Sequence, residues 1–281
     1  MRSLITGASG QVGYALILEL KKRGLNNLLA PSHTEMDITD QDQVLNTITS
    51  FHPDIIFHCA AYTNVEKAED EAKELCMRTN AEGTKHIVNA AAKTDAKLIY
   101  LSTECVFDGT KKGTYGVNDT TNPLNIYGKS KLIGENAVKN YQKHFIVRTN
   151  WVFGIGGDNF VQRVLRLSQT HNQLTMVHNK FSSPTSAKDL AKLLVDMGQT
   201  SKYGTYHAVN EGYVSRYDYA AAILKECHIN IQLNRCLASE FPSKAQMPLN
   251  AKFDTISLKQ NGFDLLPPWQ DALKEYCKEL R

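Results

Sequence analysis

Tyr127 and Lys131 are the two side chains of this sequence best placed for proton transfer. They stand four residues apart in a stretch with a helical pattern, Tyr127–Asn140, so both project from one helix face. A free tyrosine has a pKa of about 10, and a neighbouring ammonium group favours the phenolate and lowers that pKa. Tyr127 is therefore a candidate general acid. The same spacing also occurs by chance on solvated helices.

A glycine-rich turn near the N-terminus supports the functional interpretation. Its G-x-x-G-x-x-G spacing follows the predicted strand Ser3–Thr6 and opens a predicted helix. A turn without side chains lets a pyrophosphate approach, and a helix N-terminus supplies free N–H groups. The residues that we predict to bind a dinucleotide here are Gly7, Gly10, Gln11, Val12 and Gly13. The alternative is a tight turn that holds no ligand.

The end of the second predicted strand bears on which dinucleotide binds. An acidic residue at this place favours NAD through the ribose hydroxyls, but the sequence Ala30-Pro31-Ser32-His33 contains none. We therefore expect NADPH, with NADH as the alternative. Asp37 and Ile38 follow in a loop, where they would contact the adenine, unless Asp37 caps the next helix instead.

Two hydroxyl side chains end the fourth predicted strand, in Leu101-Ser102-Thr103. In open α/β sheets, ligands bind beyond the carboxyl ends of the strands. A hydroxyl there can hydrogen-bond a carbonyl oxygen as negative charge develops on it. Thr103 is the better candidate for this role and Ser102 the alternative, although both could simply cap the strand.

Residues 1–150 alternate short apolar runs with longer helical patterns. The predicted strands are Ser3–Thr6, Asn27–Ala30, Asp54–His58, Lys97–Leu101 and Phe145–Thr149. The predicted helices are Gln11–Arg23, Gln41–Phe51, Asn64–Thr79, Ala81–Lys93 and Tyr127–Asn140. Continuously apolar strands that alternate with helices are typical of parallel sheets covered on both faces. We therefore predict an α/β fold with a Rossmann-like, doubly wound parallel sheet.

The pattern is looser after Trp151. The predicted helices there are Phe160–Thr170, Lys188–Met197, Arg216–Glu226 and Trp269–Leu280, and the predicted strands are Leu174–Val177 and Thr205–Val209. The segment Asn230–Pro268 has no strong period. We predict a dinucleotide-binding domain over residues 1–150, rejoined by about residues 186–210, and a smaller, interleaved substrate lobe within residues 151–281.

Composition excludes several classes of protein. The 281 residues carry 32 Lys and Arg against 29 Asp and Glu, and a net charge of +3 is too small to indicate nucleic-acid binding. No apolar run approaches the roughly 18 residues of a membrane span, and no secretory signal is recognisable. Six cysteines without a C-x-x-C pair favour unpaired thiols in the cytoplasm. No His/Cys cluster has the spacing of metal ligands.

Together these motifs resemble the extended short-chain dehydrogenase/reductases. Residues 60–69 (AAYTNVEKAE), 106–109 (VFDG), 148–153 (RTNWVF) and 183–185 (SPT) are similar to the dTDP-4-dehydrorhamnose reductase family. The resemblance covers nearly the whole chain and is weak after Glu226. It implies hydride transfer from NADPH or NADH to C4 of a dTDP-4-keto-6-deoxy sugar, in nucleotide-sugar and polysaccharide biosynthesis.

Carried over by position, the resemblance implies a catalytic set of Thr103, Tyr127 and Lys131. Tyr127 would protonate the C4 oxygen, Lys131 would lower the pKa of Tyr127 and hold the nicotinamide ribose, and Thr103 would orient the carbonyl. The residues that would line the cofactor further along are Ala60, Ala61 and Tyr62. Those that would contact the substrate are Thr103, Glu104 and Trp151, unless Trp151 is a core aromatic.

The implied partner is a small nucleotide sugar, and we expect neither nucleic acid nor membrane as a partner. A homodimer is compatible with the resemblance. Mg²⁺ has been associated with parts of the family, but the sequence gives no support for a metal site.

Three departures from the family leave the identity of the sugar open. Thr103-Glu104-Cys105 stands where the family usually has Thr-Asp-Tyr. Residues 179–185 read NKFSSPT against a usual Asp-Gln-x-Gly-x-Pro-Thr, and Gln246-Met247-Pro248 lacks an expected arginine. An arginine contact to phosphate is not easily replaced.

Two other functions remain open on the sequence. A sugar-nucleotide epimerase or dehydratase of the same superfamily would share the fold, but Cys105 stands where a 4,6-dehydratase carries a glutamate. A non-catalytic regulatory subunit would bind a dinucleotide without turnover. The intact set of Thr103, Tyr127 and Lys131 argues against that function.

Overall fold

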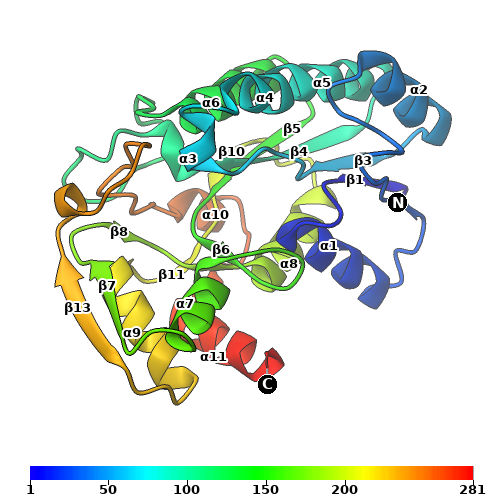
Figure 1. The fold of residues 1–281 in the computed structure, drawn as a ribbon. Coiled ribbons are helices and arrows are strands. Elements are labelled where there is room, and N and C mark those ends of the chain that lie inside the picture. Colours follow the sequence, from blue (N-terminus) through cyan, green and yellow to red (C-terminus); the bar gives the residue numbers. More distant parts are fainter. Residues whose placement is uncertain (281) are drawn as a thin grey trace.

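The computed structural model describes residues 1–280 and is built around a six-stranded parallel sheet (Figure 1). The strand order is β10 (Gly204–His207), β5 (His144–Thr149), β4 (Lys97–Thr103), β3 (Ile55–His58), β1 (Ser3–Thr6) and β2 (Leu28–Leu29). Every neighbouring pair is parallel. The predicted doubly wound α/β sheet is therefore confirmed.

Helices cover both faces of this sheet (Figure 1). One face carries α2 (Gln41–Phe51), α5 (Gly83–Thr94) and α6 (Ile126–Lys139), and the other carries α1 (Gln11–Lys22) and α8 (Ala187–Gly198). Successive side chains of a strand point to opposite faces, so each face has its own core. Leu4 packs with Ile48, whereas Ile5 packs with Leu16 and Leu190. This double burial explains the continuously apolar strands of the sequence.

The helix predicted over Asn64–Thr79 is wrong as a continuous element. The chain instead forms α3 (Val65–Ala68), α4 (Lys73–Met77) and a π-helical turn over Arg78–Glu82 that runs into α5. The buried side chain of Asn80 accepts from the Tyr62 N–H at 2.8 Å and donates to the Tyr62 carbonyl at 3.0 Å and to Ser130 Oγ at 2.9 Å. These tertiary bonds hold the backbone in a turn that helical periodicity does not predict.

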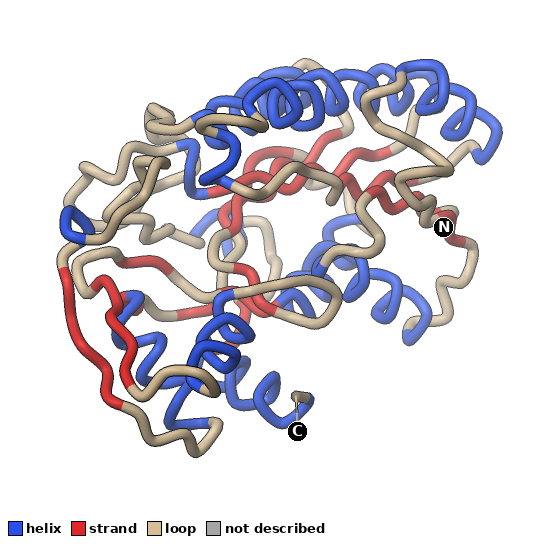
Figure 2. The backbone as a smooth tube through the Cα atoms, in the orientation of Figure 1, coloured by secondary structure: helices blue, strands red, loops and turns tan. Residues whose placement is uncertain are grey.

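A second lobe follows the sheet and appears in the lower part of Figure 2. Its helices are α7 (Phe160–Ser168), α9 (Arg216–Glu226) and α11 (Trp269–Glu279). The short helix α10 (Ile256–Gln260) instead packs on the sheet, where Leu258 shares a core with Tyr206 of β10. The strand pairs of the second lobe are β7 (Gln173–Val177) with β13 (Gln232–Cys236), β8 (Phe181–Ser182) with β12 (Val214–Ser215), β6 (Val152–Phe153) with β9 (Thr185–Ser186), and β11 (Asn210–Glu211) with β14 (Leu266–Pro268). Tyr219 lies in its core, in ring contact with Phe160 and Trp269.

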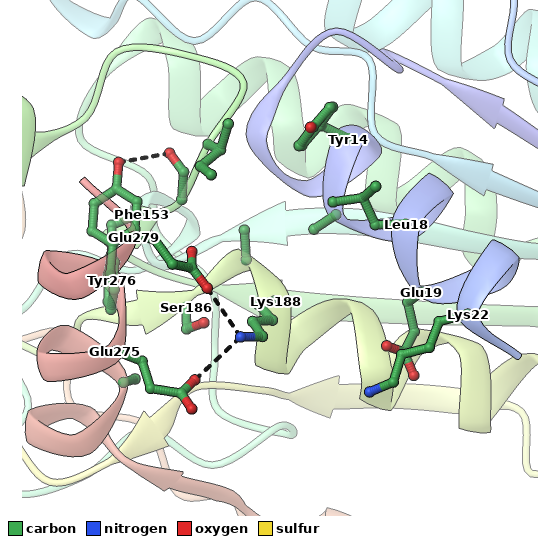
Figure 3. Close-up of a pocket in the computed structure, with 15 residues that line it drawn as sticks. Tyr14, Leu18, Glu19, Lys22, Phe153, Ser186, Lys188, Glu275, Tyr276 and Glu279 are labelled. Atoms are coloured by element: carbon green, nitrogen blue, oxygen red, sulfur yellow. Dashed lines mark hydrogen bonds and ion pairs between the residues drawn. The ribbon is translucent and has the colours of Figure 1, made fainter. Parts of the chain in front are cut away.

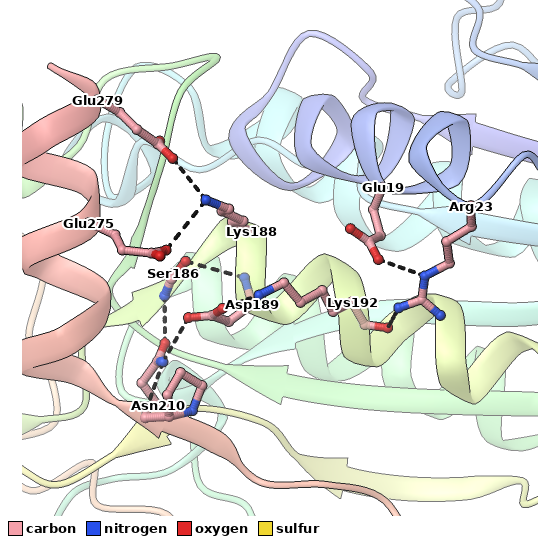
Figure 4. A network of polar contacts seen from close by, with 10 residues as sticks. Glu19, Arg23, Ser186, Lys188, Asp189, Lys192, Asn210, Glu275 and Glu279 are labelled. Atoms are coloured by element: carbon pink, nitrogen blue, oxygen red, sulfur yellow. Dashed lines mark hydrogen bonds and ion pairs between the residues drawn. The ribbon is translucent and has the colours of Figure 1, made fainter.

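Helix α8 links the two parts of the molecule (Figure 4). Lys188 contacts Glu275 and Glu279 of α11 at 3.4 and 3.0 Å, and Asn210 Nδ2 donates to Asp189. On its other side α8 packs on α1. The structure thus interleaves residues 187–207 with the sheet, while the domain boundaries given above stay a prediction.

The structure also bears on membrane spans and on disulfides. Over residues 1–280, no helix combines the length and apolarity that crossing a membrane requires. None of the six cysteines, all of which lie in this range, forms a disulfide.

Candidate active site

A cavity of about 1110 Å³ opens at the carboxyl ends of β1, β3, β4 and β5. All twelve residues predicted to contact the cofactor line it: Gly7, Gly10, Gln11, Val12, Gly13, Asp37, Ile38, Ala60, Ala61, Tyr62, Tyr127 and Lys131. The fold therefore brings together segments that are up to about half the chain apart in sequence.

The glycine turn is shaped by close backbone contacts that exclude side chains. Gly7 has φ +66°, and a Cβ there would lie 2.7 Å from the Ala60 nitrogen. A Cβ on Gly13 would lie 2.2 Å from the Gly7 carbonyl oxygen. No side chain caps α1 at Gly10, so the first amides of the helix remain available to an anionic ligand.

The far end of the cavity contains polar residues that the sequence analysis did not select. Ser32, His33 and Arg78 line it there. Glu35 also lines this end, because its carboxylate accepts hydrogen bonds from the Ser32 N–H and Oγ, both at 2.7 Å. Residues 30–33 contain no acidic side chain, as the sequence indicated. The carboxylate of Glu35, however, folds back to this end of the cavity. Arg78 supplies a cation at the same end.

Asp37 does not cap the following helix. Its carboxylate accepts from the Thr39 N–H at 2.8 Å, whereas Asp40 accepts from the Asp42 and Gln43 amides and caps α2. Asp37 is therefore left in the cavity wall.

Tyr127 and Lys131 enter the cavity from the first turns of α6. Asn125 caps this helix by accepting from the Gly128 N–H at 2.7 Å. Gly128 allows a close approach, since a Cβ there would lie 2.1 Å from the Cys105 carbonyl oxygen. The helix start is thereby held against the segment that follows β4, next to Thr103.

Burial sets the charge of both groups. Lys131 is 3% exposed, its ammonium group lies 4.1 Å from the Tyr100 ring centroid, and burial lowers its pKa to about 7 despite the opposing charge of Glu135. Burial raises the pKa of Tyr127, the charges of Cys105 and Glu104 add to this, and a hydrogen bond with Thr103 opposes it. The direction is opposite to the lowering expected from Lys131, because burial of the phenol is the largest influence on its pKa and disfavours the phenolate.

Thr103 and Glu104 lie at the end of β4, behind the cavity wall. Thr103 Oγ1 donates to a Glu104 carboxylate oxygen at 3.1 Å and accepts from the Cys105 N–H at 3.2 Å. Both side chains are buried. Burial raises the pKa of Glu104, and the charge of Lys180 partly offsets that rise.

Trp151 occupies a core position at the junction of the two lobes. It is 9% exposed, has a φ of +43°, and stacks on Tyr219 with ring centroids 6.2 Å apart. The guanidinium carbon of Arg216 lies 3.6 Å from its ring centroid. Trp151 is therefore a core aromatic, which was the alternative left open by the sequence. Its contact with substrate stays a prediction.

A segment of the second lobe completes the cavity wall, and sequence reasoning missed it. Gly156, Gly157 and Asp158 line the cavity, and the Gln11 side chain donates to the Asp158 carbonyl at 3.4 Å. Gly156 has φ +96° and packs against Gly10 and Tyr14. The run Gly154-Ile155-Gly156-Gly157 was a usable signal, because it repeats the glycine richness of the first turn.

A second, smaller pocket of about 240 Å³ lies between α1, α8 and α11 (Figure 3). Tyr14, Leu18 and Phe153 supply its apolar wall, and its one bridging cation, Lys188, is already held by Glu275 and Glu279. It contains none of the predicted site residues. Over residues 1–280, no group of three or more His, Cys, Asp and Glu side chains is arranged to hold a metal ion.

Comparisons with known proteins agree with this geometry. Residues 1–281 match a family model described as the RmlD substrate binding domain. A dTDP-4-dehydrorhamnose reductase of Aggregatibacter actinomycetemcomitans is 38% identical, over 97% of both chains. The crystal structure of a dTDP-4-dehydrorhamnose reductase from Clostridium acetobutylicum has a TM-score of 0.96 and 36% identity, over 100% of this chain and 99% of that one. That of the Bacillus anthracis enzyme in complex with NADP has a TM-score of 0.95 and 35% identity, over 99% of both chains.

Proposed function

The chain belongs to the RmlD substrate binding domain family, and from that premise we propose that it reduces the C4 keto group of a dTDP-4-keto-6-deoxy sugar with NADPH. The resemblance drawn from its motifs is confirmed at the level of the family. One observation carries the proposal. A single cavity is lined by the glycine turn and by Tyr127 and Lys131.

The proposed chemistry assigns one task to each side chain. NADPH, when bound along the cavity, supplies the hydride. Tyr127 gives its phenolic proton to the C4 oxygen, and Lys131 stabilises the phenolate that remains. Thr103, whose hydroxyl donates to Glu104 in this structure, turns its O–H to the C4 oxygen as charge develops there. The high pKa of the buried phenol keeps it protonated until the oxyanion forms, which suits a general acid.

We take dTDP-4-dehydrorhamnose, the sugar named for the relatives, as the first substrate to test. Close relatives of this sugar are the next. Six cysteines without a disulfide support a cytoplasmic location, where thiols remain reduced. The homodimer stays a prediction.

The dehydratase alternative lacks its acid–base residue. Cys105, which stands at the corresponding position, is 2% exposed, and burial raises its pKa to about 12. A buried thiol with so high a pKa cannot replace the glutamate as a general acid or base near neutral pH. A reductase consumes NADPH in proportion to product, whereas a dehydratase or epimerase recycles its cofactor.

The test is NADPH oxidation with dTDP-4-dehydrorhamnose, measured for the wild type and Tyr127→Phe. We expect stoichiometric oxidation and, in the variant, a kcat lower by roughly 10²–10⁴ with unchanged NADPH affinity. Tyr14→Phe removes an exposed phenol from α1 and is the matched control. Full turnover in Tyr127→Phe would refute the mechanism, and NADPH binding without oxidation would favour the regulatory subunit.

A further inference from the structure

Two cationic side chains stand side by side in the second lobe, outside the cavity described above. Strands β8 and β12 pair antiparallel, with Phe181 opposite Ser215, and the Arg216 N–H donates to the Lys180 carbonyl at 3.2 Å. Lys180 and Arg216 are therefore neighbours across the strand pair. Like charges in this arrangement destabilise a sheet, so their pairing calls for a compensating interaction.

The guanidinium group of Arg216 is held in one orientation but is incompletely bonded. It lies 3.6 Å over the Trp151 ring and 4.4 Å over the Phe160 ring. Its Nη1 atom is buried and finds no hydrogen-bond acceptor in the described part of the chain. A buried donor without a partner costs free energy. The unpaired donor therefore belongs to a guanidinium group whose orientation is already fixed by the two aromatic rings.

Negative charge within the protein does not balance the two cations. The charge of Glu104 acts on both cations and that of Glu66 acts on Lys180, while Arg163 adds positive charge near Arg216. Across residues 1–280, neither Lys180 nor Arg216 forms an ion pair within 4.0 Å of a carboxylate. Burial, with the charge of Arg216, lowers the pKa of Lys180 to about 8, and burial lowers that of Arg216 to about 10. The cluster is therefore short of one anion.

The position of the cluster indicates where that anion belongs. Glu104 follows Thr103, the hydroxyl that we assign to the C4 carbonyl, and shares a hydrogen bond with it. In a nucleotide sugar, C4 and the diphosphate on C1 lie on opposite sides of one hexose ring. A sugar whose C4 faces Thr103 thus carries its diphosphate about one ring width away, within reach of a cationic cluster beside Glu104.

We propose that Lys180 and Arg216 form the subsite that binds the diphosphate of the nucleotide sugar. This inference rests on the proposed function for the choice of ligand. The planar guanidinium of Arg216 suits bidentate contact with phosphate oxygens, and Lys180 adds a point charge. Glu104 then limits the positive charge of the subsite before the ligand enters.

The test measures binding of thymidine diphosphate and thymidine to the full chain by calorimetry, for the wild type, Lys180→Gln and Arg216→Gln. Each substitution should weaken the binding of thymidine diphosphate by roughly 10–100-fold, the range for hydrogen bonds to charged groups. The affinity for thymidine should stay unchanged. Glu104→Gln should tighten thymidine diphosphate. Lys252→Gln is the control, because its ammonium lies over the Phe181 and Tyr213 rings rather than beside Arg216.

The outcomes separate this inference from the proposed function. An unchanged ratio of the two affinities in Lys180→Gln would overturn the subsite, as would a wild type that does not prefer the diphosphate. Arg216→Gln loses contacts with two rings, so Arg216→Lys and the melting temperature distinguish lost binding from lost folding. A lowered ratio without NADPH oxidation would retain the subsite and reject the reductase.

Discussion

Lys131 is a cation that the fold keeps in an unfavourable place. It is almost fully buried, over an aromatic ring and one helical turn from Glu135, and its pKa falls to about 7. The folded protein therefore binds fewer protons at this side chain than the unfolded chain does between about pH 7 and 10.5. A lysine retained at this cost is explained by the function proposed for it.

The cost of Lys131 should be visible as a pH-dependent stability difference. Because the folded-state pKa is depressed, the penalty is complete below about pH 7 and disappears as pH rises towards 10.5, at about 1.4 kcal/mol per pKa unit. Lys131→Met should therefore be more stable than the wild type by a few kcal/mol at pH 6.5, with a smaller difference at pH 9.5. Urea unfolding of both proteins over this range measures it.

A control for the Lys131 experiment is Lys93→Met, an exposed lysine of α5. Its free energy of unfolding should follow that of the wild type at every pH. A constant difference between Lys131→Met and the wild type would show that Lys131 keeps an ordinary pKa in the folded protein.

Residue types and spacing were sufficient to select Tyr127, Lys131 and the glycine turn, which line one cavity in the structure, because each motif depends on local geometry. They were insufficient for Arg78, Glu35 and Arg216. Glu35 reaches the cavity by folding back onto Ser32, and Arg216 meets Lys180 only through the pairing of β8 with β12. The hydrophobic periodicity of one sequence cannot predict such tertiary contacts.

At the scale of elements, α6 is positioned by a buried ion pair. Glu135 accepts from Arg148 Nε at 2.8 Å and Nη2 at 2.7 Å, and from Ser102 Oγ at 2.6 Å. These bonds join α6 to β5 and β4. They fix the face of the helix that carries Tyr127 and Lys131, which helical spacing alone could not orient.

The turn between β1 and α1 gives the second prediction. In Gly13→Ala the new Cβ would meet backbone atoms of Gly7 and Ala8 at 2.2 and 2.8 Å, so the turn must move. We expect a loss of roughly 1–3 kcal/mol in the free energy of unfolding, as for overpacked cores, together with weaker NADPH binding. Chemical denaturation and fluorescence titration measure the two effects.

Gly116→Ala supplies the comparison, because its Cβ would have only an Asp119 oxygen nearby, at 3.9 Å. This variant should keep the stability and NADPH affinity of the wild type. Equal effects of the two substitutions would show that crowding at the turn does not control the site.

Elements with strong local signals agreed with the sequence. Gln41–Phe51 and Arg216–Glu226 form helices with the predicted bounds, each with a capping side chain at the preceding residue. Strand β13 was missed within Asn230–Pro268. Its residues Gln232–Cys236 are mostly polar and partly exposed, so they show no apolar pattern, and they form a strand by pairing with β7. Its strand character comes from the partner strand.

At the scale of the whole molecule, residues of both lobes line the cavity. The glycine turn and residues 60–62 belong to the sheet, whereas residues 156–158 follow β6 in the second lobe. The Gln11 side chain already contacts Asp158 across this junction. A dinucleotide in the cavity would therefore contact both lobes at once.

The last prediction concerns this joint contact, and amide hydrogen exchange of the full chain measures it. A ligand at about 100 times its dissociation constant stabilises the bound state by about 2.7 kcal/mol, so amides that exchange only after its release should slow roughly a hundredfold. NADPH should protect residues 154–158 as well as residues 7–13. Strand β13, which lies far from the cavity lining, should exchange at its original rate. Protection confined to residues 7–13 would mean that the cofactor contacts only the sheet, and the glycine run at 154–157 would then serve the fold alone.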